Sequence, residues 1–343
     1  MNDFFIDSHK LLWHLDRLND WNNNKLISPI YTEVSLTNVC NHHCIFCGVD
    51  FAKGKQFIDT NVLKKAISGM ARADVKSIMF AGEGEPLLHK QFYEIVEHTY
   101  INDINTAIAT NGSVNNKVLC DTIPFLSFLR FSFNAGLSST YQYIHKTTKE
   151  MFSITTKNIK NVVDTRNSNN TKCQITMQFV VLNENKEDIH NFIHLANDLG
   201  VDLAIIKPYS RHPLSTNGID IEYTKEDIEK IELLANEHKN VIFRKDSFVS
   251  YINKNITEHC WALPFWAYIS SKGDFYTCSV HLGDDNYCAG NIYNDSIDTI
   301  LFGEKRLKAI NNDCAKYRIN CRMAKANVFL SMLKDKPEFV NFI

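Results

Sequence analysis

The chain has 343 residues, of which 44% are hydrophobic and 22% are charged, a balance typical of folded globular proteins. Lys and Arg number 37 against 39 Asp and Glu, so the net charge is −2, which argues against a dedicated nucleic-acid binder with its usual basic excess. The sequence has no basic stretch followed by a long apolar run near its start, and no window of 18 uninterrupted apolar residues. We therefore expect no secretory signal, no membrane span and a cytoplasmic protein.

The first predicted element is a helical N-terminal extension over residues 1–27, because HKLLWHLDRLNDW spaces its apolar residues as a helix does. Compact apolar runs of strand length follow. The six predicted strands cover residues 28–37, 75–81, 104–110, 128–134, 172–182 and 201–208. Helical patterns lie between them, near residues 60–72, 91–101, 138–145, 151–165 and 186–199. Strands that alternate with helices predict a parallel sheet with right-handed crossovers.

The predicted fold class is α/β, a partial (β/α)6 TIM-type barrel over residues 28–240. A complete eight-fold barrel takes about 250 residues, and the six units found here take fewer. Residues 210–223 are rich in turn formers, and a helix over 224–238 follows them. Residues 241–343 form a smaller predicted α+β domain with a C-terminal helix. In it, a turn at residues 272–274 joins two short strands as a hairpin.

Cys40, Cys44 and Cys47 follow the first predicted strand with C-x3-C-x2-C spacing. Three thiolates in one loop can wrap a single metal centre and leave one coordination position open. A structural zinc site normally has four protein ligands, and His42 or His43 could supply the fourth. A ferredoxin-type cluster also takes four cysteines, at another spacing. The spacing alone therefore leaves an iron–sulfur site, a zinc site and unrelated cysteines open.

With Phe46 before the last cysteine, after the first strand of a partial barrel, this motif resembles that of the radical S-adenosylmethionine (SAM) superfamily. The resemblance spans roughly residues 28–325. It implies that the three thiolates hold three irons of a 4Fe–4S cluster, whose fourth iron binds the amino and carboxylate groups of SAM. In that family, one electron from a donor such as flavodoxin or ferredoxin splits SAM. The resulting 5′-deoxyadenosyl radical abstracts a hydrogen atom from the substrate.

Polar segments at later strand ends agree with this resemblance. AGEGEPLLH after the second strand is similar to the family's Gly-Gly-Glu-Pro segment with one extra residue, and ATNGS after the third resembles the segment near the cofactor's ribose. Each segment alone could equally be a turn or a solvated strand end, and Lys207 could contact the substrate instead. All lie at carboxyl ends of strands, where barrels place active sites. The implied cofactor-binding residues are Phe46, Gly82, Gly84, Glu85, Pro86, Thr110, Asn111, Ser132, Asn134 and Lys207.

A second set of cysteines lies in the C-terminal domain. The C-x12-G-x4-C spacing across the hairpin resembles the SPASM or twitch domain, which holds auxiliary iron–sulfur clusters. Asn311 stands where the seven-cysteine version of that domain would have a cysteine, so the resemblance implies one auxiliary 4Fe–4S cluster. A zinc site and scattered buried cysteines are the alternatives. The implied auxiliary ligands are Cys260, Cys278, Cys314 and Cys321.

Two other cysteines are candidate hydrogen donors. In radical epimerases of this superfamily a cysteine returns a hydrogen atom to the product radical, and Cys288 and Cys173 are the candidates here. Cys288 could also replace one of the four auxiliary ligands.

The predicted substrate is a small molecule, namely a sugar, nucleotide-sugar or aminocyclitol that is oxidised or epimerised. The one-cluster form resembles dehydrogenases of sugars and aminocyclitols. Hydrogen-bonding candidates for a hydroxylated substrate are Asn134, Gln178, Lys207, Tyr209, Arg211 and His212. Radical modification of a peptide or protein is the alternative, although the 27-residue extension is short for a leader-binding domain. A zinc-stabilised binding module without catalysis is the alternative from another class.

Overall fold

The computed structural model describes residues 10–253, 259–312, 314, 321–335 and 337–341. Its strands are β1 (Tyr31–Val34), β2 (Ser77–Phe80), β3 (Asn105–Thr110), β4 (Leu126–Ser132), β5 (Gln174–Val181), β6 (Leu203–Pro208), β7 (Val241–Phe243), β8 (Trp266–Ile269), β9 (Asp274–Tyr276) and β10 (Cys288–Asn291). They form one 10-stranded sheet, in the order β10-β9-β8-β1-β2-β3-β4-β5-β6-β7.

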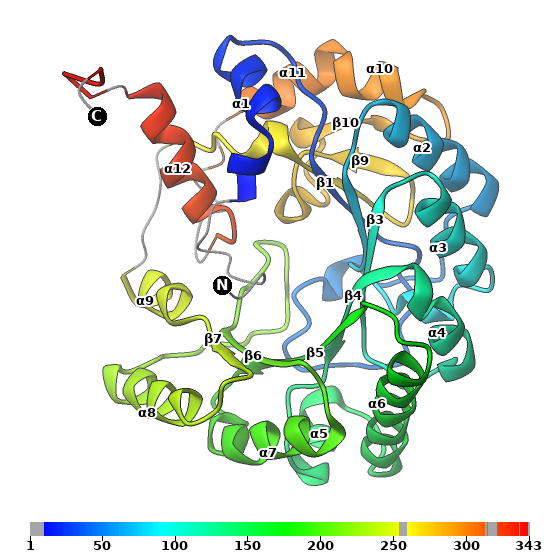
Figure 1. The fold of residues 1–343 in the computed structure, drawn as a ribbon, viewed down its shortest axis with the longest axis vertical. Coiled ribbons are helices and arrows are strands. Elements are labelled where there is room, and N and C mark those ends of the chain that lie inside the picture. The colour runs from blue at the N-terminus through cyan, green and yellow to red at the C-terminus, as the bar shows by residue number, and fades with distance from the viewer. Residues whose placement is uncertain (1–9, 254–258, 313, 315–320, 336, 342–343) are drawn as a thin grey trace.

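The helices lie mostly outside this sheet, which Figure 1 shows as an arc with α2, α3, α4, α6, α7 and α8 around it. They are α1 (Leu15–Asn22), α2 (Thr60–Arg72), α3 (Phe92–Ile101), α4 (Asn116–Thr122), α5 (Ser138–His145), α6 (Glu150–Ser168), α7 (Ile189–Leu199), α8 (Lys225–Asn236), α9 (Lys245–Asn253), α10 (Ile297–Phe302), α11 (Glu304–Asn311) and α12 (Ala324–Lys334).

The predicted partial barrel is confirmed, since β1 to β6 pair in parallel in chain order. Helix α2 has the predicted bounds because Asp59 caps it: the carboxylate accepts hydrogen bonds from the backbone N–H groups of Asn61 and Val62, both at 2.9 Å. The elements that were not predicted include helix α4 and strand β7. Helix α4 is only 7 residues long, and the three-residue strand β7 pairs in parallel with β6. Both are too short to show a clear period in the sequence.

The two faces of the sheet differ in exposure. On β4, Leu129 and Phe131 point to the outer face and are fully buried beneath the helices, at 0% exposure. Phe128, Arg130 and Ser132 alternate with them on the concave face and are only half-buried. Solvent therefore reaches side chains on the concave face, as a binding site there requires.

The C-terminal domain continues the barrel sheet. Strand β8 pairs in parallel with β1, so that Tyr31 lies opposite Trp266. Strands β9 and β10 then add antiparallel pairs at this edge. The predicted hairpin is present as β8 and β9, and its turn contains Gly273 at a φ of +84°. The sheet thus joins the three-cysteine half of the molecule directly to the second cysteine set.

Helix α1 packs on the C-terminal domain. Leu18 and Trp21 share a core with Leu263, Phe265 and Leu330. The rings of Trp21 and Phe265 meet edge to face, with centroids 5.5 Å apart. Residues 1–9 of the predicted extension lie outside the described residues.

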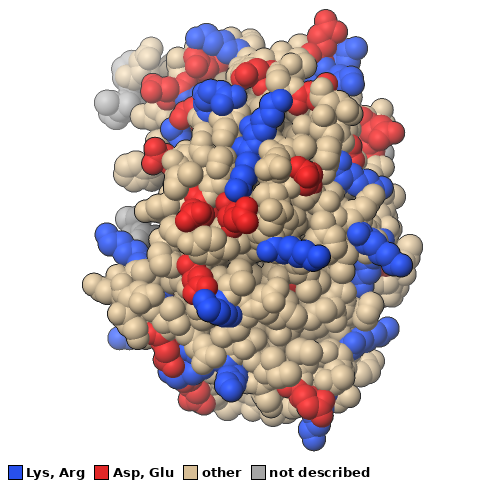
Figure 2. Space-filling model, turned by 90° about the vertical axis from the view of Figure 1, so that its right-hand side faces the viewer, with Lys and Arg blue, Asp and Glu red and all other residues tan. Residues whose placement is uncertain are grey.

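The helical face on the right of Figure 1 carries mixed charges. Figure 2 shows Lys and Arg interspersed with Asp and Glu over this face. Lys64 on α2 pairs with Glu94 on α3 at 3.3 Å, an exposed pair of the kind that contributes little stability. On this face, no patch of one sign would steer a charged partner. In the part of the chain that the structure describes, no helix is long and apolar enough to cross a bilayer.

Candidate radical SAM active site

The loop after β1 carries the three-cysteine motif. None of the ten cysteines, all of which the structure describes, forms a disulfide. The backbone N–H of Cys47 donates to the carbonyl of Cys44 at 3.2 Å, which turns the loop back on itself. Burial raises the pKa of the Cys44 thiol, and neighbouring Cys40 and Cys47 raise it further. The three half-buried thiols disfavour one another's ionisation, and a cationic iron–sulfur cluster would stabilise their thiolate forms. These residues therefore fit the implied cluster.

Two buried histidines lie next to Cys44, namely His42 within the loop and His145 at the end of α5. Nδ1 of His145, at the end of α5, is 3.0 Å from Sγ of Cys44, and its Nε2 is 2.8 Å from the carbonyl oxygen of Phe133. His42 is 1% exposed, and its ring nitrogens have no hydrogen-bond partner among the described residues. Burial lowers the pKa of His42 to about 3 and that of His145 to about 4. Ligand atoms of His42, Cys44 and His145 all lie within 4.8 Å of one another.

The spacing of the motif points to His42 as a possible metal ligand, whereas nothing in the sequence points to His145. The two partners Cys44 and His145 are 101 positions apart, and a histidine at a helix end carries no signal of its own in a single sequence. Phe46, a predicted cofactor residue, meets the ring of His145 edge-on, with centroids 5.9 Å apart.

The Gly-Glu-Pro segment after β2 lies against the three-cysteine loop. A Cβ atom on Gly84 would come within 2.3 Å of the carbonyl oxygen of Val39 and 2.6 Å of that of Thr37. Only glycine therefore fits at this approach. The backbone N–H of Glu85 donates to Val39 O at 2.9 Å. Pro86 is buried at the start of a short 3-10 turn, Pro86–Leu88.

The side chain of Glu85 fastens this segment to the end of β3. It is 2% exposed. Its carboxylate accepts hydrogen bonds from Thr110 Oγ1 at 2.6 Å and from the N–H groups of Asn111 and Leu87 at 2.7 and 3.1 Å. Burial raises the pKa of Glu85 to about 7 against the effect of these donors. The carboxylate therefore ties the loop after β2 to the end of β3.

Other predicted cofactor residues fall into two groups. Asn111 is 8% exposed, and its Nδ2 donates to Asn41 of the three-cysteine loop at 2.9 Å. Ser132 lies half-buried on the concave face. Asn134 is instead fully buried, where its Oδ1 accepts from Val180 N at 2.8 Å and its Nδ2 has no described partner. The structure thus brings Asn111 to the cysteine loop and puts Asn134 inside the end of the β4–β5 pair.

The extra residue of AGEGEP has a structural role that the sequence analysis missed. Glu83 is 4% exposed, and it accepts hydrogen bonds from Ser271 N at 2.9 Å, Ser271 Oγ at 2.6 Å and Tyr268 Oη at 3.1 Å. Gly82 before it has a φ of +122°, and a Cβ there would meet Tyr268 Oη at 2.6 Å. This insertion therefore joins the loop after β2 to the C-terminal hairpin.

The four predicted auxiliary ligands lie together. Cys260, Cys278 and Cys314 are buried in the core that also holds α1, and Cys321 is half-buried beside them. A hydrogen bond with Cys260, then burial, then the proximity of Cys278 and Cys321 raise the pKa of Cys314. Burial and the neighbouring Cys278 and Cys260 raise the pKa of Cys321 to about 12. Nε2 of His281 lies 3.2 Å from Cys314 Sγ. Four thiols in one buried group fit a closed auxiliary cluster.

Of the two candidate hydrogen donors, Cys288 packs on the same small core as Val49 and Phe51 of the three-cysteine loop, whereas Cys173 lies apart from both cysteine groups. Cys288 is half-buried on β10, and its Sγ lies 3.5 Å from Gly290 O. Cys173 is 1% exposed in the main core, just before β5. It therefore lies at the amino end of that strand, away from the carboxyl edge where the three-cysteine loop is found.

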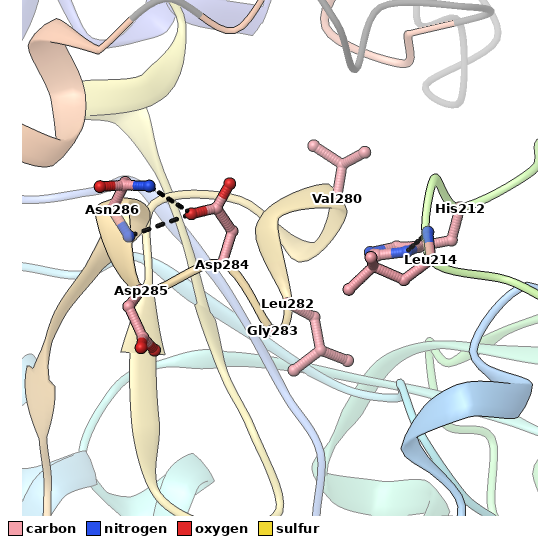
Figure 3. Close-up of a pocket in the computed structure, with 8 residues that line it drawn as sticks. All are labelled: His212, Leu214, Val280, Leu282, Gly283, Asp284, Asp285 and Asn286. Atoms are coloured by element: carbon pink, nitrogen blue, oxygen red, sulfur yellow. Dashed lines mark hydrogen bonds between the residues drawn. The ribbon is translucent and has the colours of Figure 1, made fainter.

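A pocket of about 420 Å³ opens between the loop after β6 and the C-terminal domain (Figure 3). Its lining is His212, Leu214, Val280, Leu282, Gly283, Asp284, Asp285 and Asn286. The ring of His212 packs on Phe51 of the three-cysteine loop, with centroids 4.6 Å apart. Asn217 Nδ2 donates to the carbonyl of Cys47 in the same loop, 3.0 Å away. The pocket therefore borders the three-cysteine loop, and it contains one predicted substrate contact, His212.

Two further predicted substrate contacts hold the loop after β6 in shape. Tyr209 Oη accepts from Asn217 Nδ2 at 2.8 Å, and Arg211 donates to Ser215 O at 3.2 Å. Gln178 is 7% exposed, and Lys207 is half-buried on the concave face.

Comparisons with known proteins agree with this geometry. The family model of the radical SAM superfamily matches residues 34–196, and the model of the SPASM iron–sulfur cluster-binding domain matches residues 260–323. A "Probable GTP 3′,8-cyclase" of Saccharolobus islandicus is 26% identical over 209 residues. That match covers 58% of this chain and 65% of the relative, so the chain spans just under two thirds of this relative's length. A "Tungsten-containing aldehyde ferredoxin oxidoreductase cofactor-modifying protein" of Pyrococcus furiosus is 24% identical over 179 residues, 51% of this chain and 50% of that protein.

Solved structures share the fold. Streptococcus suis SuiB bound to the precursor peptide SuiA matches with a TM-score of 0.67 at 14% identity, over 97% of this chain and 80% of that one. Native anSMEcpe with bound AdoMet matches with a TM-score of 0.55 at 15% identity, over 82% of each chain. The radical SAM domain implies a 4Fe–4S cluster and SAM, and the SPASM domain implies auxiliary iron–sulfur chemistry, which confirms the predicted cofactors. The chain belongs to the radical SAM superfamily and carries a SPASM domain.

Proposed function

We propose that this enzyme abstracts a hydrogen atom from a small molecule, a sugar, nucleotide-sugar or aminocyclitol, and thereby oxidises or epimerises it. The observation that carries the proposal is the pocket of about 420 Å³ beside the three-cysteine loop, a size typical of small-molecule sites. A curated relative named as a GTP cyclase acts on a nucleotide, which supports a small substrate of this class. Cytoplasmic location is part of the proposal, because free thiols and iron–sulfur clusters fit a reducing compartment.

The residues of this chain would divide the work between cofactor and substrate. Cys40, Cys44 and Cys47 would hold the cluster, and the backbone around Gly84 and Glu85 would face the methionine end of SAM. When bound, the cluster and SAM supply a 5′-deoxyadenosyl radical, with an electron from a donor such as flavodoxin or ferredoxin. The chain's own part is to hold these groups and the substrate at the carboxyl edge of the strands.

Peptide modification is the second candidate. The structural relative SuiB was solved with a precursor peptide, and likeness at 14% identity shows the fold alone. A zinc-binding role rests on the trio of His42, Cys44 and His145.

Anaerobically reconstituted enzyme tests these candidates. With SAM and dithionite it should release 5′-deoxyadenosine, and Cys44→Ala should abolish that release, whereas Cys120→Ala, outside both cysteine groups, should not. A panel of nucleotide sugars, aminocyclitols and peptides deuterated at carbon should then be screened for deuterium transfer into 5′-deoxyadenosine. Transfer from a peptide alone would favour the second candidate. Stoichiometric zinc without 5′-deoxyadenosine would reject both.

A further inference from the structure

Charged side chains gather on the concave face of the sheet. Glu33 projects there from β1, Arg130 from β4 and Lys207 from β6, and Arg322, just before α12, reaches the same group. Arg130 and Lys207 are half-buried, while their neighbours on the outer face are buried under the helices. Three cations therefore surround one carboxylate inside the barrel.

Arg322 already has its counter-charge. Its Nη2 donates to Oε2 of Glu33 at 2.8 Å. The guanidinium also stacks over the ring of Trp266, 4.1 Å from the centroid, and it contacts Ser279 Oγ. Glu33 thus makes its ion pair with Arg322, and neither Arg130 nor Lys207 pairs with it directly.

Arg130 has few partners. Its Nη2 lies 3.9 Å from Sδ of Met79, a weak acceptor, and its Nε has no partner among the described residues. It makes no ion pair with any described carboxylate. A guanidinium whose Nε is buried and which has no carboxylate partner is costly, unless an anion binds there.

The side chain of Lys207 likewise lacks a direct partner. Its Nζ forms no hydrogen bond or ion pair with any residue that the structure describes. Burial lowers the pKa of Lys207 to about 7, and Arg130, Arg244 and Arg322 lower it further against the opposing effect of Glu33. Buried groups with such perturbed pKa values concentrate at functional sites. An anion of charge −2 would compensate both Lys207 and Arg130.

We propose that Arg130 and Lys207 bind a phosphoryl group, so that the small-molecule substrate of the proposed function is a phosphorylated one. The proposal rests on that function for the identity of the ligand as substrate. Two free cations match a phosphate dianion better than a single carboxylate, and an arginine fork matches phosphate oxygens in geometry. Under this proposal Lys207 is a substrate residue rather than the cofactor residue that the resemblance implies.

The test uses the reconstituted enzyme with both clusters and saturating SAM, and inorganic pyrophosphate as the probe in anaerobic titration calorimetry. We expect one pyrophosphate to bind per chain. Arg130→Met and Lys207→Met, which keep the length of the side chain, should each weaken binding at least tenfold. Lys225→Met, which removes an exposed cation at the start of α8, should leave binding unchanged and serves as the matched control.

Several results would overturn the proposal. One is that pyrophosphate does not bind, and another is that Arg130→Met and Lys207→Met bind it as tightly as the wild type does. A third is tighter binding of malonate than of pyrophosphate, and the last is an equal loss of SAM affinity in the two variants. The last result would assign the cations to the cofactor. Failure of the proposed function would give a different result: the wild-type enzyme would release no 5′-deoxyadenosine although pyrophosphate still bound.

Discussion

Nδ1 of His145 lies 3.0 Å from Sγ of Cys44, while the opposite nitrogen of the same ring lies 2.8 Å from the carbonyl oxygen of Phe133. The carbonyl fixes the orientation of the ring, and the ring in turn meets one of the three cluster sulfurs. Groups that hydrogen-bond to a metal ligand orient it and tune the metal. A residue distant in sequence is thereby part of the cluster's surroundings.

The first prediction concerns this contact. His145→Phe keeps a ring in place and removes the polar contact of Nδ1 with Cys44 Sγ, a contact worth about 1 kcal/mol. For a one-electron couple this is on the order of 40 mV. Nε2 of neutral His145 donates to the Phe133 carbonyl, so Nδ1 presents a lone pair to Cys44 Sγ. That lone pair opposes added negative charge on the sulfur, so we expect the potential of the radical SAM cluster to rise when it is removed, as measured by redox titration with EPR detection. His43→Phe, on an exposed neighbour in the same loop, is the control. An unchanged potential in His145→Phe would contradict the assignment.

A second prediction concerns the insertion in AGEGEP. Glu83→Gln retains an acceptor but places an amide where Ser271 Oγ donates at 2.6 Å. We expect a loss of about 1–3 kcal/mol in the free energy of unfolding, measured by urea denaturation of the reconstituted protein. Exposed Glu229 on α8 provides the control, Glu229→Gln, with no measurable loss. An equal free energy of unfolding in both variants would show that the link between barrel and hairpin does not contribute to stability.

A third prediction concerns Gly84. Its alanine variant would place Cβ 2.3 Å from Val39 O, so the segment must move away from the three-cysteine loop. We expect weaker SAM binding, by tenfold or more, with iron content largely kept. Gly48→Ala, next to Cys47, is the matched control because its Cβ would meet nothing closer than Ser210 O at 3.5 Å. If both variants bind SAM as the wild type does, the close approach has no bearing on the cofactor.

Much of this architecture follows from the sequence, and some of it does not. Strand-length apolar runs and helical periods predict β1 to β6 because helices cover the outer face of each strand. The parallel pairing of β8 with β1 has no local signal, since it depends on where the chain returns after the whole barrel has been built. The contact between Cys44 and His145 and the group around Glu33 and Arg322 arise in the same way. The spacing of cysteines in the sequence predicts which of them share a loop, whereas the residues that contact that loop depend on tertiary packing.

A fourth prediction concerns cluster number. The four grouped thiols of Cys260, Cys278, Cys314 and Cys321 suit one auxiliary cluster, so that reconstituted enzyme should contain about eight irons per chain. Cys260→Ala should reduce this to about four while the radical SAM cluster remains. Cys288→Ala should keep the wild-type content, because Cys288 lies on β10 outside the group. Iron analysis and Mössbauer spectroscopy measure the outcome, and loss of iron in Cys288→Ala would make that residue a ligand.

The fifth prediction concerns pH. Burial and the nearby Arg130, Arg244 and Arg322 lower the pKa of Lys207 to about 7, and Glu33 opposes them. Below this value Lys207 carries its charge, and above it the amine of the ligand-free enzyme is neutral. A bound dianion favours the charged form, so binding above pH 7 must take up a proton and weakens by up to about tenfold per pH unit.

Inorganic sulfate is the probe for this test, because its charge stays constant between pH 6 and pH 9. We expect its affinity to be flat below pH 7 and to fall between pH 7 and pH 8.5. In Lys207→Arg the guanidinium stays charged over the whole range, so the affinity should lose this dependence on pH. An equal decline in both proteins would assign the titrating group elsewhere. Since Arg130 remains charged throughout, the shape of the curve reports on Lys207 alone.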